Sequence, residues 1–246
     1  MSEMNEKSNK IKAFSEHEPM AEETLLAVMP VLSALQLKQF TEYYNLLLDW
    51  NSRVNLTRIT DPEEAAQKHF ADSVAASSLI PEGARVVDVG TGAGFPGVPL
   101  KIVRPDIDLV LVDSLGKRIR FLEELTRALG IEAEAVHARA EDAARRPALR
   151  ESFDIALSRA VAPMNVLLEL TTPFIKVGGA SLMYKGSGAR DELSVCERAL
   201  KALNCRADAV DFDVPWGART VVRAVKTANT PKKYPRRAGF IEKAPL

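Results

Sequence analysis

A glycine-rich loop that follows a short acidic strand is the stretch of this chain best suited to hold a small polar ligand. Residues 86–89 form an apolar run that includes Asp88, and four glycines follow by residue 97. A strand, a glycine turn and a helix in this order form the first half of a βαβ unit. Glycines allow a positive φ and close approach of a ligand to the main chain, and a helix start offers free N–H groups. The loop therefore predicts a ligand site.

Two kinds of ligand fit this loop. Residues 92–97 match the glycine pattern of a dinucleotide site, so an NAD- or FAD-dependent oxidoreductase is one alternative. Asp88 argues against it, because a carboxylate at the strand end attracts the ammonium group of a methionine moiety and repels a pyrophosphate. Pro96 and Pro99 also lack the N–H groups that a pyrophosphate would need at the helix start. These residues favour S-adenosyl-L-methionine.

Other polar residues are predicted at the ends of the neighbouring strands. In a parallel sheet, ligands bind beyond the carboxyl ends of the strands, where the strand order reverses. Asp113 lies roughly twenty residues past the glycines, where a carboxylate can bond both hydroxyls of a ribose. The later strand ends contain Ala140, Glu141, Ser158, Arg159 and Lys185. We expect these side chains to lie around one site.

The alternation of apolar runs and amphipathic segments predicts the fold. Strands are expected over residues 86–89, 108–112, 132–137, 153–157, 180–184, 207–214 and 220–225. Helices are expected over residues 117–129, 164–170 and 192–203. Strands that alternate with helices imply an α/β fold with a doubly wound, seven-stranded, mostly parallel sheet that is covered by helices on both faces.

The chain is expected to have three parts. Residues 1–20 are rich in polar and charged side chains and predict a disordered tail. Residues 21–80 predict an N-terminal helical segment packed on the main domain, with one helix running to about Trp50 and another from Asp61 to about Leu79. Residues 81–246 predict the ligand-binding domain with a basic C-terminus.

Composition and charge exclude several classes of protein. The 246 residues are 46% hydrophobic and 27% charged, as in ordinary globular proteins. Cys196 and Cys205 are the only cysteines and no histidine is grouped with them, which argues against a zinc site and a disulfide framework. With no signal peptide and no apolar run of membrane-spanning length, a cytoplasmic protein without a membrane partner is expected.

The formal net charge is zero, but it is unevenly distributed. Residues 217–246 contain eight basic residues and one acidic residue. This distribution is typical of a local site for a polyanion.

Six separated motifs, in the same order, resemble the bacterial glucose-inhibited division protein B family. The motifs are residues 50–57, 69–73, 88–100, 158–162, 184–186 and 234–239, so the resemblance extends from about residue 45 to the C-terminus. Members of this family methylate guanine N7 in 16S ribosomal RNA. The resemblance implies the Rossmann-like fold of class I S-adenosylmethionine-dependent methyltransferases, with 16S ribosomal RNA or the small ribosomal subunit as partner. A monomer is expected, because nothing in the sequence suggests a larger assembly.

The resemblance also assigns cofactor contacts. It implies that Gly90 and Phe95 contact the cofactor, that Ala140 and Glu141 place the adenine, and that Arg159 completes the pocket. Phe95 by composition alone would be assigned to core packing. From the residues themselves we add the loop residues Asp88 and Gly92 and the ribose carboxylate Asp113 to the predicted cofactor site.

The expected chemistry requires no catalytic side chain. Guanine N7 has an in-plane lone pair and no proton, so transfer of a methyl group needs alignment and tolerance of the resulting positive charge rather than a general base. Ser158-Arg159-Ala160 lacks the Asn/Asp-Pro-Pro-aromatic sequence typical of amine methylases, and neither cysteine lies at a strand end. A metal ion is not expected either.

Residues around the same edge are predicted to bind RNA. Phosphate contacts are expected from basic residues, and Tyr234 or His69 could stack on a base. The predicted set is Arg53, Asn55, His69, Asp72, Lys185, Lys232, Lys233, Tyr234, Arg236 and Arg237. Replacing Arg236 and Arg237 by Ala is expected to weaken RNA binding and flatten its salt dependence. A non-catalytic RNA-binding module with the same pocket remains a further alternative.

Overall fold

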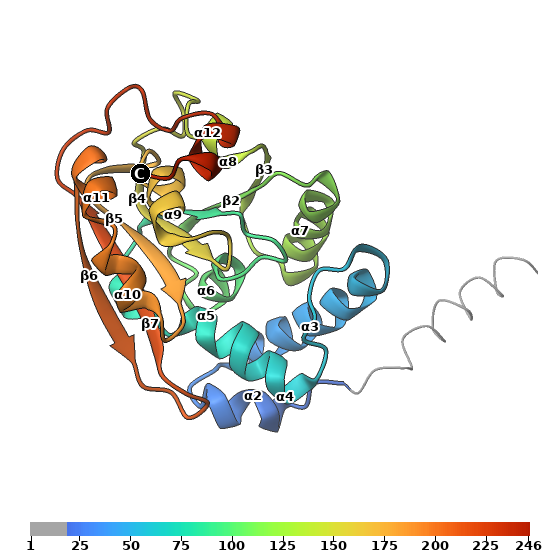
Figure 1. The fold of residues 1–246 in the computed structure, drawn as a ribbon. Helices are drawn as coiled ribbons and strands as arrows, with labels where there is room; N and C mark the ends of the chain where they lie inside the picture. Colours follow the sequence, from blue (N-terminus) through green and yellow to red (C-terminus); the bar gives the residue numbers. More distant parts are fainter. Residues whose placement is uncertain (1–18) are drawn as a thin grey trace, which may run out of the picture.

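A computed structural model describes residues 19–246, which surround a seven-stranded sheet (Figure 1). The strands are β1 (Arg85–Val89), β2 (Asp108–Asp113), β3 (Glu134–His137), β4 (Phe153–Arg159), β5 (Ile175–Lys185), β6 (Cys205–Phe212) and β7 (Arg219–Lys226). Their order in the sheet is β3-β2-β1-β4-β5-β7-β6. All neighbouring strands are parallel except β7, which is antiparallel to β5 and β6. The predicted sheet is thus confirmed.

Helices cover both faces of the sheet because its central strands are apolar on both sides. Val86 and Leu111 face one helical layer, whereas Val87 and Val112 face the other. The first layer contains α2 (Glu22–Val28), α3 (Ala34–Val54), α6 (Gly97–Val103) and α7 (Gly116–Leu129). The second contains α8 (Ala140–Ala143), α9 (Met164–Thr171), α10 (Ala189–Ser194) and α11 (Glu197–Ala202). The last helix is α12 (Ala238–Lys243).

The N-terminal helices belong to the same core as the sheet. Helix α3 begins after a capping box between Ser33 and Gln36 and ends at Asn55, whose φ of 54° is left-handed. Phe40 and Tyr43 on its inner face are fully buried against the main domain. Residues 1–18 of the predicted tail lie outside the described residues. Met20, the last residue of the predicted tail, is buried.

The segment after Asp61 is less regular than the single helix that the sequence predicts. Asp61 caps it as expected, because its Oδ1 accepts a hydrogen bond from the Glu64 N–H at 2.8 Å. The segment then passes through α4 (Pro62–Ala65), the π-helix η1 (Ala66–Ala71), α5 (Asp72–Val74) and the 3₁₀ turn η2 (Ser77–Leu79). A π-helix changes the carbonyl pairing of its turn and often marks a functional site.

Strand β3 begins two residues later than predicted and β6 is shifted by two residues toward the N-terminus, and two other elements differ more. The helix expected over residues 192–203 is divided into α10 and α11, and the carboxylate of Glu192 in α10 bonds the Met164 N–H and the Lys185 ammonium. Strand β5 begins earlier than expected and includes Gly178 and Gly179. Tertiary contacts thus override the local pattern at both places. Between Pro19 and Leu246, no helix is long and apolar enough to cross a membrane.

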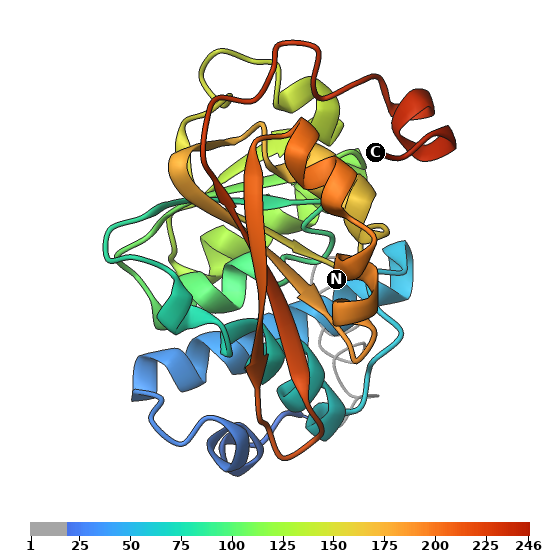
Figure 2. The ribbon, with the colours of Figure 1, turned by 60° about the vertical axis from the view of Figure 1, so that its left-hand side comes forward.

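The hairpin of β6 and β7 extends along the molecule to the N-terminal helical segment (Figure 2). In the loop between these strands, the Trp216 Nε1–H donates a hydrogen bond of 2.5 Å to Oδ1 of Asp72. The C-terminal part of the sheet is therefore joined to α5, close to the carboxyl ends of β4 and β5.

Candidate cofactor cavity and acceptor pocket

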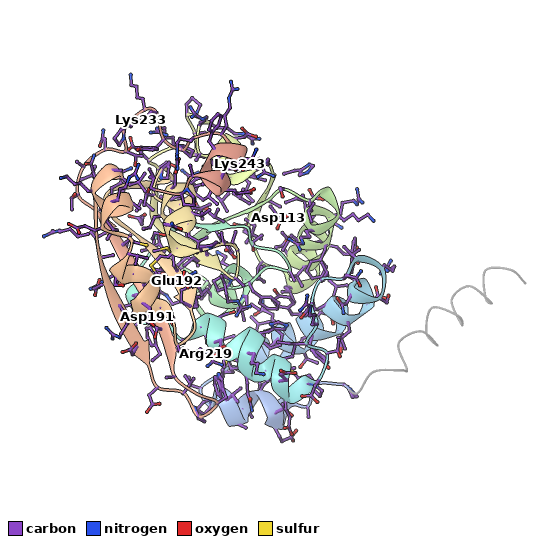
Figure 3. All side chains as sticks on the ribbon, viewed as in Figure 1. Asp113, Asp191, Glu192, Arg219, Lys233 and Lys243 are labelled. Atoms are coloured by element: carbon purple, nitrogen blue, oxygen red, sulfur yellow. The ribbon has the colours of Figure 1, made fainter. Side chains whose placement is uncertain are left out.

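A cavity of about 420 Å³ lies at the carboxyl ends of β1, β2, β3 and β4. The strand order reverses between β1 and β4, which is where an open α/β sheet binds its ligand. Among the predicted cofactor residues, Gly90, Asp113, Ala140 and Glu141 line this cavity. Figure 3 shows Asp113 at this edge of the sheet, beside α7.

Asp113 connects the glycine loop to the end of β2. Its Oδ2 accepts a hydrogen bond of 3.0 Å from the Gly92 N–H and pairs with Arg118 at 3.3 Å, and its Oδ1 accepts one of 2.8 Å from the Leu115 N–H. The side chain is nearly buried, so these contacts fix its orientation. Each carboxylate oxygen has two lone pairs, and Oδ1 keeps capacity to accept a bond from a sugar hydroxyl.

The opposite wall of the cavity is formed by α8 and the C-terminal segment. Glu141 is buried and pairs with the Arg139 Nε at 2.5 Å. Glu242 and Pro245, which the sequence did not indicate, also line the cavity, and Glu242 lies 3.9 Å from Arg139. The C-terminal segment therefore contributes to the cofactor cavity in addition to presenting basic residues.

Asp88 lies beneath the glycine loop and is not among the residues that line the cavity. Its Oδ2 accepts hydrogen bonds of 2.8 Å from the Thr91 hydroxyl and from the Gly97 N–H. Its Oδ1 is buried and has no hydrogen-bond partner among the described residues. The sequence placed Asp88 beside the ammonium group of the cofactor, whereas the structure gives its carboxylate the task of holding both ends of the loop together.

Phe95 is also held inside the protein, in a column of rings. The Phe95 ring stacks on Tyr43, with centroids 5.2 Å apart, and on His69, with centroids 4.5 Å apart. The Tyr43 hydroxyl donates a hydrogen bond of 2.5 Å to the Ala93 carbonyl. Phe95 is buried in this column, as composition predicts, and its contact with the cofactor stays a prediction of the resemblance.

Arg159 closes the same column at the end of β4. Its guanidinium lies 4.9 Å from the centre of the Phe95 ring and donates to the carbonyls of Lys68 and His69 at 3.1 and 3.4 Å and to the Ser73 hydroxyl at 3.0 Å. These acceptors lie in or beside the π-helix η1. Burial lowers the pKa of Arg159, and its ring and carbonyl contacts compensate for the loss of water.

A second hollow, which we call the acceptor pocket, has a volume of about 550 Å³ and opens on the other side of Ala160. Ala160 lines both the cofactor cavity and this pocket. The other polar or aromatic residues of the acceptor pocket are Asp72, Arg159, Tyr184, Lys185, Ser187, Phe212, Arg219 and Thr220. Sequence reasoning missed Arg219, for which the basic C-terminal stretch was the only signal.

Several predicted RNA contacts have other partners in the structure. Tyr234 is buried, so its ring is not available to a base. Arg236 donates to both carboxylate oxygens of the buried Glu169, at 2.6 to 3.1 Å. His69 is enclosed by Phe95 and by the Thr57 hydroxyl, which lies 2.7 Å from its Nε2. The assignments of Tyr234 and Arg236 are therefore revised, whereas His69 is only half-buried and its RNA contact stays a prediction.

The remaining predicted RNA residues fall into two groups. Lys185 bonds the Ala162 carbonyl at 3.0 Å and Glu192 at 2.8 Å, and Asp72 pairs with Arg219 at 2.8 Å, so both are engaged at the acceptor pocket. The exposed group is Arg53, Asn55, Lys232, Lys233 and Arg237, of which Arg53 pairs with Asp49 and Asn55 ends α3. In Figure 3, Lys233 and Lys243 lie at the end of the molecule opposite Arg219.

The buried carboxyl of Asp88 predicts a pH dependence of stability. Burial raises the pKa of Asp88 from 3.8 to about 6. Between these values the folded protein retains a proton that the unfolded chain releases, so this group makes stability fall as pH rises. Asp88→Asn removes that contribution. Relative to the wild type, the variant is expected to gain about 2 kcal/mol of stability as pH rises from about 4.5 to about 6.5.

His69 acts in the opposite direction in the same range. Burial, assisted by Arg159, lowers its pKa from 6.5 to about 3, so the unfolded chain binds the proton first and stability falls as pH decreases. Urea unfolding of wild type and Asp88→Asn at a series of pH values gives the difference between their free energies of unfolding. The contribution of His69 is the same in both proteins and cancels in this difference. A difference that stays constant with pH would contradict the role given to Asp88.

Known proteins resemble this chain in sequence. A family model described as rRNA small subunit methyltransferase G, or GidB, matches residues 36–214. The chain is 47% identical to Ribosomal RNA small subunit methyltransferase G of Desulfitobacterium hafniense, over 87% of this chain and 91% of that protein. It is also 47% identical to the protein of that name from Lactobacillus delbrueckii subsp. bulgaricus, over 91% and 97%.

Solved structures resemble the fold at low sequence identity. Cofactor-bound Rv0187 from MTB has a TM-score of 0.57 and 18% identity, with 87% of this chain and all of that chain covered. A methyltransferase from Pyrococcus furiosus has a TM-score of 0.53 and 12% identity, with coverage of 78% and 99%. At these identities the likeness extends to the fold alone.

Proposed function

This chain belongs to the family of rRNA small subunit methyltransferase G, and on that premise we propose that it methylates N7 of a guanosine in 16S ribosomal RNA. It is an S-adenosylmethionine-dependent methyltransferase that acts on ribosomal RNA. The observation that best supports methyl transfer to a base is the meeting of two hollows at Ala160, one suited to a methyl donor and the other to a base. The proposed partner is 16S RNA or the small subunit. The protein is proposed to act as a monomer in the cytoplasm.

The residues of the cofactor cavity fit S-adenosyl-L-methionine. A Cβ added at Gly90 would lie 2.8 Å from Cγ2 of Val161, so this cradle accepts only a bare main chain. The oriented carboxylate of Asp113 would hold the ribose hydroxyls, and Ala140 and Glu141 would hold the adenine. Gly92 and Asp88 would keep the loop in shape around the cofactor.

The proposed reaction places few demands on side chains. S-adenosyl-L-methionine supplies a methyl group on a positively charged sulfur, and its transfer to N7 breaks a C–S bond, forms a C–N bond and leaves a neutral thioether and a cationic base. Because N7 has no proton to lose, the residues around Ala160 need only align the base and exclude water. Asp72 would place negative charge near the cationic product. No side chain is therefore proposed as a general base.

Methyl transfer to ribosomal RNA tests this proposal directly. Small subunits from cells that lack the family's enzyme would be incubated with the protein and labelled S-adenosyl-L-methionine, and the RNA would then be digested to nucleosides. The label is expected in 7-methylguanosine from 16S RNA. A label in protein or on an exocyclic amine would contradict the proposal, and so would RNA binding without any transfer, which is the outcome for a non-catalytic module. Calorimetry should show binding of S-adenosyl-L-methionine and none of NAD.

The two neighbouring arginines near the C-terminus are predicted to behave differently. Arg237→Ala should weaken RNA binding and reduce its salt dependence by about one phosphate contact, because this exposed side chain has no bonding partner among the described residues. Arg236→Ala should instead lower the free energy of unfolding by about 3 kcal/mol, because the buried Glu169 carboxylate loses its guanidinium partner and keeps only the main-chain N–H of residue 236.

Salt titrations of RNA binding and urea unfolding of both variants measure this contrast. Arg237→Ala is expected to unfold like the wild type and to bind S-adenosyl-L-methionine with unchanged affinity. An unchanged salt slope for Arg237→Ala would remove that residue from the RNA interface. Unchanged stability for Arg236→Ala would show that its contact with Glu169 has little structural weight.

A further inference from the structure

Asp72 presents a fixed carboxylate to the acceptor pocket. Its Oδ1 accepts one hydrogen bond of 2.5 Å from the Trp216 Nε1–H, and its Oδ2 accepts one of 2.8 Å from the Arg219 Nε–H. The side chain keeps 14% of its surface exposed and lines the pocket. An ionised carboxylate has about four acceptor positions. Each oxygen therefore keeps one acceptor position for a ligand.

Guanine has the matching groups. Its N1–H and N2–H₂ donors are adjacent and parallel, which suits a carboxylate that accepts two bonds. Adenine has an unprotonated N1 and a C–H group at the corresponding positions, so its N1 lone pair would face the negative charge without a hydrogen bond. Guanine N7 lies on the edge opposite N2. A base with its N1 and N2 groups at Asp72 can therefore direct N7 away from Asp72.

This arrangement agrees with the positions of the two hollows. Asp72 belongs to α5 at one side of the acceptor pocket, whereas Ala160 lies at the end of β4, where the pocket meets the cofactor cavity. A base between them would have one edge toward Asp72 and the other toward the methyl donor. The pocket also contains Lys185 and Arg219, which offer donors to guanine O6 or to a phosphate.

We propose that Asp72 is the residue that selects guanine, by accepting hydrogen bonds from N1–H and N2–H₂ of the base in the acceptor pocket, with Trp216 and Arg219 as positioning residues that orient its carboxylate. The proposal rests on the proposed function, because it concerns the acceptor of the same reaction. The contacts of Trp216 and Arg219 come from the loop and strand at the far end of the chain. They fix the carboxylate before the base arrives, so little ordering is required on binding.

A cycle of one protein change and one substrate change tests the direct contact. Inosine lacks only the N2 amino group of guanosine and keeps N7. Small subunits would be reconstituted with 16S RNA that contains guanosine or inosine at the methylated position, and methyl transfer would be measured with wild type and Asp72→Asn. Asp208→Asn is the matched control, because Asp208 also pairs with an arginine, Arg223, at 2.8 Å on the β6–β7 hairpin but does not line the pocket.

For the wild type, inosine is expected to lower kcat/KM by about 10- to 100-fold, as for loss of one hydrogen bond to a charged group. Asp72→Asn should lower transfer to guanosine by about 100-fold or more and bring the ratio of guanosine to inosine close to one. Asp208→Asn should keep the wild-type ratio. Affinity for S-adenosyl-L-methionine should be unchanged in both variants.

The outcomes separate this proposal from the proposed function. If the wild type does not methylate guanosine, the proposed function fails. If it does, but the guanosine to inosine ratio is the same in wild type and Asp72→Asn, Asp72 has only a structural role and the selection proposal is overturned. If thermal unfolding shows that Asp72→Asn does not fold, the guanosine to inosine ratio of the wild type decides alone. A ratio near one contradicts the proposal, and a ratio of about ten or more supports it.

Discussion

Gly94→Ala is expected to lower the free energy of unfolding by about 3 kcal/mol or more and to abolish measurable binding of S-adenosyl-L-methionine. Gly94 has a φ of 95°, and a Cβ there would lie 2.6 Å from the Tyr43 hydroxyl and 2.9 Å from Cγ2 of Val98. Tyr43 is fully buried and bonded to the loop at Ala93, so it has no room to withdraw. The added methyl group must therefore displace the loop itself.

Gly83→Ala is the matched control for this change. Gly83 also has a positive φ, of 64°, but a Cβ there would meet nothing within 4 Å. It should cost only the backbone strain of about 1–2 kcal/mol, with unchanged affinity for the cofactor. Urea unfolding and calorimetric titration measure both quantities. Equal effects of the two substitutions would show that crowding beneath the loop does not determine cofactor binding.

Arg159→Met is expected to lower stability by about 2–3 kcal/mol, because buried acceptors lose their donor, and to reduce methyl transfer to background. Its guanidinium joins β4 to the π-helix η1 through the carbonyls of Lys68 and His69, and it covers the Phe95 ring. The methionine side chain can fill the space but cannot donate to these carbonyls. The Phe95 ring would then lose its cover, and the wall between the cofactor cavity and the acceptor pocket would become disordered.

Arg85→Met provides the control for Arg159→Met. Arg85 also lies over an aromatic ring, 4.5 Å from the centre of Phe153, but it stands at the amino end of β1 and pairs with the exposed Asp108. Its replacement should cost stability without loss of methyl transfer per folded molecule. Unfolding curves and transfer rates corrected for the folded fraction give the comparison. A folded and fully active Arg159→Met protein would contradict the assignment of Arg159 to the site.

Local sequence patterns were sufficient to predict the sheet and one side of the cofactor site. The apolar runs of β1 and β2 can be recognised from the sequence alone. The strand order then places Gly90 and Asp113 at the carboxyl edge of the sheet. The loop could be located for the same reason, because glycines in sequence between a strand and a helix need no distant partner. These predictions depended on residues close together in the chain.

The remaining site depends on contacts between distant segments. Phe95 lies in a ring column because Tyr43 from α3 packs beside it, and the spacing of the glycines contains no information about that helix. Asp72 is bonded to Trp216, 144 residues later. The basic C-terminal stretch was recognised only from its number of charges. That number could not reveal that Arg236 pairs with Glu169 in α9. The sequence alone predicted most helices and strands, but it did not predict which side chains bond to one another.

Replacement of the methylated guanosine by 7-deazaguanosine tests the central claim most directly. This analogue keeps the N1, N2 and O6 groups that would hold the base in the acceptor pocket, but a C–H group replaces N7 and removes its lone pair. Small subunits reconstituted with either nucleoside would be incubated with the protein and labelled S-adenosyl-L-methionine. We predict close to one methyl group on each guanosine-containing subunit and none on the 7-deazaguanosine subunit. Equal labelling of the two would show that the methyl group goes to another atom and would contradict methylation at N7.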